Sequence, residues 1–152
     1  MKINPCLLLF ILATTIACKN THHAKTSHIE EVADSFATNY FNAMYQQAAR
    51  FTTPESEQYL HFAASQIGQE DIDVLNQQEE PATIEITNVE YEDGDTTATV
   101  SLNVMNYLCM DTIGKPGHIV ENGDFKITLV YTNKQWRVRM EGLPQKEKTN
   151  HD

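Results

Sequence analysis

The chain has 152 residues, with 21 acidic and 11 basic side chains and a formal net charge of −10 at pH 7. A chain of this size forms one domain, and its negative charge repels phosphate backbones, so nucleic acid is excluded as a partner. Between Arg50 and Lys115 there are 13 Asp and Glu residues and no Lys or Arg, which we interpret as a solvated acidic face, the alternative being a patch for a basic partner or divalent cations.

The N-terminal segment has the pattern of a signal peptide. Lys2 precedes an uncharged apolar run over 6–16, which is too short to span a membrane. Thr15–Cys18 (TIAC) follows this run and resembles the bacterial lipobox, in which the cysteine is acylated and becomes the mature N-terminus. We predict that 1–17 is removed and that palmitate-type chains on Cys18 anchor the protein, since each buried CH2 contributes about 0.8 kcal/mol. An ordinary signal peptide is the alternative.

Cleavage there leaves 135 residues with a formal charge of −11, because one lysine and no acidic residue are removed. Cys6 is lost and Cys18 is acylated, so Cys109 has no intramolecular disulfide partner. We interpret Cys109 as a small buried side chain rather than a reactive thiol. The expected location is the bacterial cell envelope, facing the periplasm. Cys18 is not followed by an acidic run, so nothing in the sequence argues for export to the cell surface.

The mature chain is predicted to begin with a tether and a long helix. Residues 18–27 lack apolar periodicity and form the predicted tether to a domain over 28–142. Ser27 and Glu30 have the spacing of a capping box, which places the helix N-cap at Ser27. Apolar side chains then recur at helical spacing over 29–48, which predicts one amphipathic helix with an aromatic stripe.

Two shorter helices are predicted next. Thr53-Pro54 has the form of an N-cap followed by proline at the first helical position, and Gly68 ends this helix. A third helix is predicted over 71–77, with Ile72 and Leu75 facing inward.

After Pro81 the apolar pattern alternates, which predicts strands. A phase shift near Thr87-Asn88 indicates a bulge, Asp93-Gly94 predicts a hairpin turn, and Asn122-Gly123 predicts a bulge or tight turn inside the third strand. A flexible polar tail is predicted over 143–152. The predicted strands are 83–92, 96–108, 119–131 and 136–140.

Helices followed by a meander predict an α+β fold, in which N-terminal helices pack on a curved four-stranded antiparallel sheet. A curved sheet under a long helix leaves a cone with a pocket at its wide end. No cofactor is expected in this pocket, because no catalytic, metal-binding or phosphate-binding motif occurs in the chain.

Four segments, together with the order of the predicted elements, carry a resemblance to a known fold: Val32–Tyr45, Phe51–Pro54, Thr97–Val104 and Lys134–Val138. With these segments the chain resembles the nuclear transport factor 2-like superfamily, which includes the SnoaL-like proteins and has a cystatin-like cone. The resemblance covers 28–142, and the chain is similar to the uncharacterised lipoproteins of this superfamily in bacterial envelopes. The functions that the resemblance implies are those of isomerases, dehydratases and hydrolases, and equally those of ligand binders and assembly scaffolds.

The candidate site residues are aromatic and histidine side chains. The resemblance to ketosteroid-isomerase-type members implies a helix tyrosine as oxyanion donor and an Asp base, for which Asp71 and Asp73 are the candidates, although no motif aligns either of them. We therefore assign no catalytic residue and favour pocket-wall roles. The predicted pocket residues are Tyr40, Tyr45, His61 and Trp136.

Other titratable residues are interpreted as structural. His61 and His118 could each shuttle a proton, but a partly exposed structural histidine is the favoured interpretation. Three histidines lie in or beside the tether without fixed geometry, and the carboxylates near the first hairpin do not follow an EF-hand order, so no metal site is expected. These residues are His22, His23 and His28, and Glu90, Glu92, Asp93 and Asp95.

Two functions are compatible with these features. We favour a non-catalytic envelope lipoprotein that binds a small apolar ligand or a protein partner, because a catalytic set is missing. The alternative is an isomerase or dehydratase that acts in the pocket. A homodimer through the open sheet face is compatible with either function.

Overall fold

The computed structural model describes residues 20–92, 94–111 and 114–148. The predicted signal peptide, Cys18 and Asp93 lie outside the described residues, so the predictions made for them stay predictions. Within the described part of the chain, no helix is long and apolar enough to cross a membrane. The elements are α1 (Asn20–Phe41), α2 (Tyr45–Ala48), the 3-10 helices η1 (Ala49–Phe51) and η2 (Pro54–Ser56), α3 (Glu57–Gln66), α4 (Gln69–Gln77), β1 (Thr83–Tyr91), β2 (Thr97–Cys109), β3 (His118–Thr132) and β4 (Gln135–Arg139).

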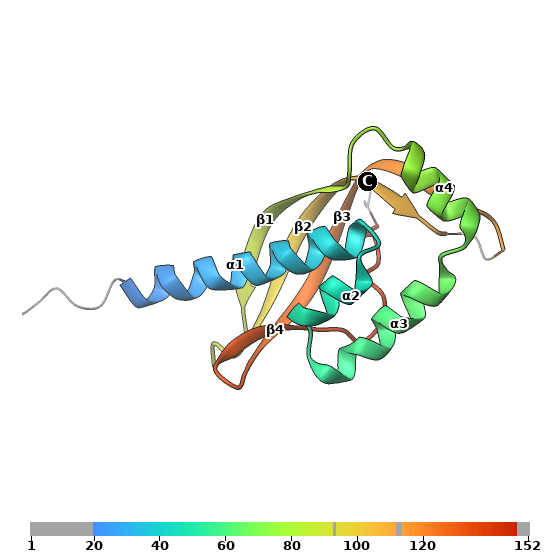
Figure 1. Cartoon of the computed structure of the whole chain (residues 1–152). Helices are drawn as coiled ribbons and strands as arrows, with labels where there is room; N and C mark the ends of the chain where they lie inside the picture. The colour runs from blue at the N-terminus through green and yellow to red at the C-terminus, as the bar shows by residue number, and fades with distance from the viewer. Residues whose placement is uncertain (1–19, 93, 112–113, 149–152) are drawn as a thin grey trace, which may run out of the picture.

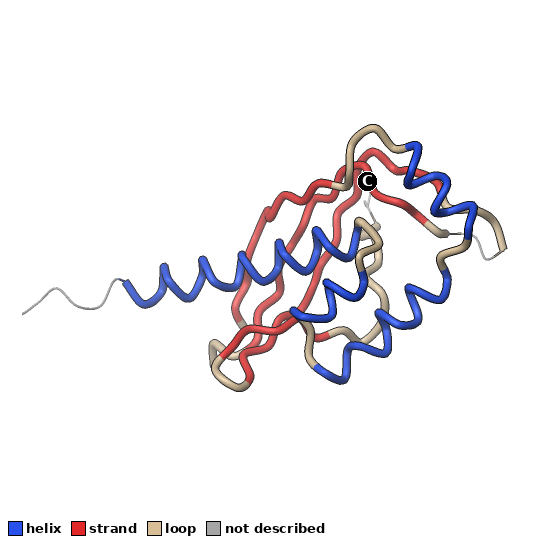
Figure 2. Tube along the Cα trace, in the orientation of Figure 1, coloured by secondary structure: helices blue, strands red, loops and turns tan. Residues whose placement is uncertain are grey.

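The four strands form one antiparallel sheet in the order β1-β2-β3-β4. Helix α1 lies across one face of the sheet, α2 turns back beside the C-terminal part of α1, and α3 and α4 follow at the end of the domain away from the N-terminus of α1 (Figure 1). The tube view separates the same two layers, with the helices on one side of the strands (Figure 2). The predicted α+β class, with helices packed on a four-stranded antiparallel sheet, is confirmed.

The core lies between α1 and the inner face of the sheet. Strand β2 alternates buried and half-buried residues from Thr97 to Val104, as a strand with one covered face does. Helix α1 buries one stripe with helical spacing, and burying each large side chain contributes about 1.5–3 kcal/mol. The central members of this core are Ile29, Val32, Ala33, Phe36, Ala37, Ala98, Val100, Leu102, Val104, Leu129 and Val138.

Helix α1 begins at Asn20, so the predicted N-cap at Ser27 is wrong. Residues 20–27 contain neither Gly nor Pro. Extending a formed helix costs far less free energy than starting one, so the long packed helix propagates toward its N-terminus. The described part of the predicted tether is therefore helical.

Helix α1 ends at Phe41, so the prediction of one helix over 29–48 is wrong. The Asn42 side chain accepts a hydrogen bond from the Ala82 amide (2.9 Å) and donates one to the Ala82 carbonyl (3.0 Å). Ala43 follows with a φ of 58°, which no helix continues through. The chain turns there, and α2 starts again at Tyr45 with its ring 5.5 Å from that of Tyr40.

Helix α4 faces inward through Asp71 rather than through Ile72, whose predicted inward position is wrong because it is 41% exposed. The buried Asp71 carboxylate accepts hydrogen bonds from the backbone amides of Gly68 and Gly117, each at 2.7 Å. A negative charge in the first turn of a helix is favourable, and the two charge-assisted hydrogen bonds offset the free-energy cost of burying the carboxylate. Gly68 is the N-cap of α4, whereas α3 already ends at Gln66.

The sheet contains the predicted bulge but lacks the predicted interruption of its third strand. The register of β1 shifts between Ile86 and Asn88, which confirms the bulge. Strand β3 runs unbroken through Gly123, and a Cβ atom there would lie 2.5 Å from the Tyr107 hydroxyl. Glycine at this position therefore makes room for the Tyr107 side chain instead of making a turn.

Part of the predicted flexible tail, over 143–148, makes contacts with β3. The Glu147 amide donates a hydrogen bond to the Asp124 carbonyl (2.7 Å), and its carboxylate lies 3.0 Å from Lys126 Nζ. Lys146 forms an isolated bridge with Phe125. Because β4 pairs with β3 only at Thr128–Thr132, the tail occupies the strand edge that β4 leaves open. Residues 149–152 lie outside the described chain.

Gly123→Ala is predicted to destabilise the domain by about 1–3 kcal/mol, because the added methyl group overlaps the Tyr107 hydroxyl. The free energy of unfolding from urea denaturation measures the change. Gly142→Ala is the matched control, because its Cβ would meet no atom within 4 Å. A double-mutant cycle with Tyr107→Phe should recover part of the loss, whereas strict additivity would contradict the overlap.

Candidate functional site

A cavity of about 190 Å³ lies between the α1–α2 corner and the end of the β2–β3 hairpin, beside the C-terminal segment. Helix α1 supplies one wall, the second half of β2 supplies another, and the tail closes a third. Its lining is Tyr40, Phe41, Ala43, Tyr45, Tyr107, Leu108, Cys109, Met110, Phe125, Leu143, Pro144 and Lys146.

The aromatic walls of the cavity pack against one another. The ring of Phe41 lies 4.7 Å from that of Phe125 and 5.8 Å from that of Tyr107, and the last two rings are 5.2 Å apart. Edge-to-face and tilted pairs at such distances are worth about 0.5–1.5 kcal/mol each beyond their buried area. The walls are therefore held in place before any ligand enters.

The cavity tyrosines carry protonated hydroxyl groups. Burial, together with the smaller effect of the negative charge on Asp71, raises the pKa of Tyr45 to about 12. Burial also raises the pKa of Tyr40 and Tyr107 above the ordinary tyrosine value. At neutral pH these hydroxyls can donate hydrogen bonds, and none of them can act as a ready base.

The hydroxyl of Tyr107 is buried and has no hydrogen-bond partner among the described residues. A buried polar group left in this state costs about 1–3 kcal/mol. The sequence pattern does not predict Tyr107 as a pocket residue, because β2 alternates inward at even-numbered positions up to Val104. Asn106 has a φ of 54°, which changes the phase and turns Tyr107 inward.

The structure brings two of the four predicted pocket residues together. Tyr40 and Tyr45 line the cavity. Trp136 is 1% exposed and packs against Tyr91 and Tyr131, with ring distances of 6.2 and 5.3 Å. These residues lie at the opposite end of the strands, so Trp136 belongs to the core. His61 is exposed on α3 and does not line the cavity.

The candidate acids do not reach the cavity. Asp71 is held by two backbone amides, and Asp73 is exposed on α4 with a hydrogen bond from Gln69. Neither residue lines the cavity, and its described lining contains no carboxylate or imidazole. An acid–base pair of the kind that the resemblance implies is absent from these lining residues.

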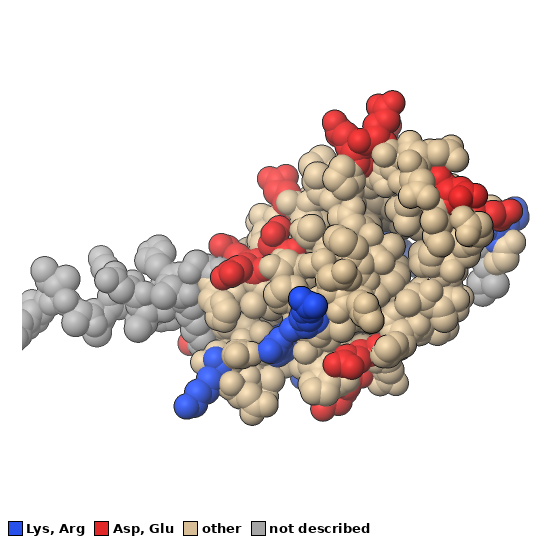
Figure 3. All heavy atoms as spheres, in the orientation of Figure 1, with Lys and Arg blue, Asp and Glu red and all other residues tan. Residues whose placement is uncertain are grey.

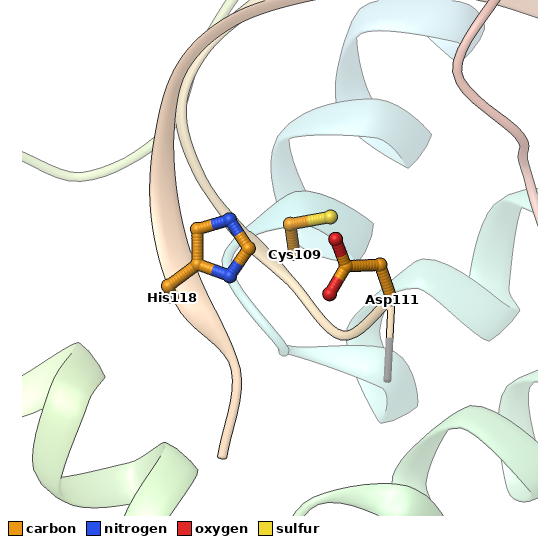
Figure 4. A group of neighbouring side chains, drawn as sticks. All are labelled: Cys109, Asp111 and His118. Carbon is orange, nitrogen blue, oxygen red and sulfur yellow. The ribbon is translucent and has the colours of Figure 1, made fainter. Parts of the chain in front are cut away.

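One group of side chains in the described part of the chain brings three potential metal ligands close together. Cys109, Asp111 and His118 each offer one ligand atom, and these atoms all lie within 4.8 Å of one another. The three side chains gather where β2 ends and β3 begins (Figure 4). The sequence alone does not connect Cys109 with His118, because nine positions separate them along the chain and only the strand register brings them together.

On one face of the domain, acidic side chains are spread out rather than gathered in one patch (Figure 3). On the face seen in Figure 3, Asp and Glu appear at several separate places, with a few Lys and Arg between them. This distribution agrees with the interpretation of a solvated acidic surface.

Fold and cavity together define a small α+β domain in which an amphipathic helix crosses a four-stranded meander and an aromatic cavity opens at one end. No protein-family model and no curated protein matches the chain. Similar solved structures include members of the nuclear transport factor 2-like superfamily, the superfamily that the sequence resembles.

Three similar solved structures illustrate the likeness. A Shewanella oneidensis NTF2-like protein of unknown function is 9% identical, with a TM-score of 0.48, covering 74% of this chain and 93% of its own. A Mycobacterium tuberculosis protein of unknown function is 14% identical, with a TM-score of 0.49, and the match covers 77% of this chain and 69% of that protein. A Novosphingobium aromaticivorans protein provisionally described as a scytalone dehydratase is 13% identical, with a TM-score of 0.48, and the match covers 86% of this chain and 93% of that protein.

Asp71→Asn is predicted to destabilise the domain by about 2–3 kcal/mol, because an amide cannot accept from both backbone N–H groups as the carboxylate does. Thermal or urea unfolding measures the loss. Asp73→Asn, on the exposed side of the same helix, should change stability by less than about 0.5 kcal/mol. Equal effects of the two substitutions would contradict the role of Asp71.

The stability of the domain is predicted to fall as the pH rises from about 10 toward 12. Folded Tyr45 keeps its proton up to about pH 12, whereas the unfolded chain releases it near 10.0, so the folded state binds more protons in this window and loses stability as the pH rises. Tyr45→Phe keeps the ring and removes the titrating group, so the fall should become shallower. Urea unfolding at several pH values tests this, and an unchanged slope would contradict it.

Proposed function

We propose that this chain is a lipid-anchored envelope protein whose α+β domain binds a small apolar ligand without catalysing its conversion. The cavity between α1, β2 and the C-terminal segment is the observation that carries the proposal. The lipobox-like Thr15–Cys18 supports the anchor.

The size of the cavity sets the class of ligand. An apolar protein cavity of about 150 Å³ stays dry and binds benzene, and this cavity measures about 190 Å³. It therefore suits a single aromatic ring or the end of an acyl chain. A drug-sized ligand needs about 300 Å³ or more.

The lining favours a ligand with an apolar body and one polar end. Phe41, Phe125 and Leu143 present apolar surface to the cavity. Lys146 is the cation among the described lining residues, and its position in the C-terminal segment suits an acidic or hydroxyl group on the ligand.

The same lining argues against the isomerase or dehydratase alternative. Such reactions need a group that accepts a proton near neutral pH. The described lining offers tyrosine hydroxyls and the Cys109 thiol, and burial raises the pKa of each of these groups. An enzyme of this class would require a base from outside these residues. We therefore propose binding rather than catalysis.

The proposed anchor and the proposed ligand are related through the membrane. Acyl chains on Cys18 hold the domain near the bilayer, and apolar molecules concentrate in that bilayer. A cavity for one ring or one chain end then lies close to its source of ligand.

Indole is predicted to bind the purified protein, with a negative heat-capacity change in calorimetric titrations at several temperatures because apolar surface is buried. Met110→Trp places a large ring at the cavity wall and should weaken binding at least tenfold. Phe62→Trp is the matched control, because Phe62 is 54% exposed on α3 and does not line the cavity. Equal affinities for all three proteins would count against the cavity as the binding site.

Radiolabelled palmitate is predicted to enter the wild-type protein in bacteria and to be absent from Cys18→Ala. Cys109→Ala controls for a second thiol and should retain the label. Undiminished label in Cys18→Ala, or none in the wild type, would remove the support for a lipid anchor.

A further inference from the structure

Two potential metal ligands face each other across the β2–β3 hairpin. Cys109, the last residue of β2, is paired in register with His118, the first residue of β3. Directly opposed residues of an antiparallel pair project from the same face of the sheet. The two side chains are therefore placed together by backbone hydrogen bonding.

Asp111, which lies two residues after the end of β2, is the third potential ligand of the group. Its carboxylate lies beside the Cys109 side chain, with the His118 ring on the neighbouring strand (Figure 4). The three ligand atoms lie within 4.8 Å of one another. Ligands of one tetrahedral zinc ion lie about 3.3–3.8 Å apart, given metal–ligand distances of about 2.0–2.3 Å. Zinc binding would therefore require small side-chain rotations, and both Asp111 and His118 lie at the exposed surface rather than in the core.

The donor types select a class of metal. A thiolate and an imidazole favour zinc and its neighbours among the divalent transition metals, whereas calcium and magnesium prefer oxygen ligands alone. One sulfur, one nitrogen and one carboxylate oxygen form a three-ligand set, which leaves the fourth position of a tetrahedral ion open.

We propose that Cys109, Asp111 and His118 form a binding site for Zn²⁺, with one coordination position left for water or a ligand atom. Cys109 also lines the aromatic cavity, so the ion would sit at the cavity wall. This proposal rests on the three side chains themselves and is independent of whether the cavity binds an apolar molecule.

The metal site has a spectroscopic test. Co²⁺ is titrated into the full chain purified from membranes in detergent, and absorption is recorded. We expect one Co²⁺ per chain, a thiolate-to-cobalt charge-transfer band in the near ultraviolet, and loss of this band when Zn²⁺ displaces Co²⁺. No bound metal, or metal bound without a thiolate band, would overturn the proposal.

Variants assign the ligands. Cys109→Ser should abolish the band, and His118→Gln should weaken Co²⁺ binding at least tenfold. His118 is exposed, so this second variant reports on binding without a folding defect, which circular dichroism checks. His61→Gln is the matched control at an exposed histidine outside the group and should bind as the wild type does. Persistence of the band in Cys109→Ser would show that another thiol holds the metal and would overturn the proposed site.

Discussion

The packing of α1 against the inner face of the sheet is the contact from which the other features of the domain follow. The buried stripe of α1, with Phe36 and Ile29 fully enclosed, covers the inward residues of β2, such as Val100 and Leu102. Exposing either apolar surface to water is unfavourable. Because a folded domain is only marginally stable, it depends on burying both surfaces against each other. The helix ends before the strands do, and the space beyond Phe41 becomes the aromatic cavity.

The fold follows from local sequence patterns where burial alone decides the structure. The helical spacing of apolar residues in α1 and the strict alternation in β2 each predict one covered face, and the phase shift in β1 predicts the bulge beside Asn88. The departures come from long-range contacts that no local pattern contains. Asn42 pairs with Ala82, Asp71 reaches Gly117, and these hydrogen bonds end or orient helices that periodicity alone would prolong or rotate.

The cavity is predictable from the sequence only in part, for the same reason. Tyr40 and Tyr45 belong to the aromatic stripe of the predicted first helix, so their place beside a pocket follows from the pattern. Trp136 has an equally inward position, but strand register puts it at the far end of the sheet. Tyr107 faces inward only because the backbone of Asn106 adopts a positive φ. Cys109 and His118 likewise come together at the end of the hairpin only because of the register between β2 and β3.

If the aromatic cavity is a binding site, bound indole must lie among its rings, and nuclear Overhauser contacts between indole and assigned side-chain protons report its position. Contacts from indole to the rings of Phe41, Tyr107 and Phe125 are the expected result, because these rings enclose the cavity. Contacts confined to the exposed ring of Phe62, or to no ring at all, would contradict binding in the cavity.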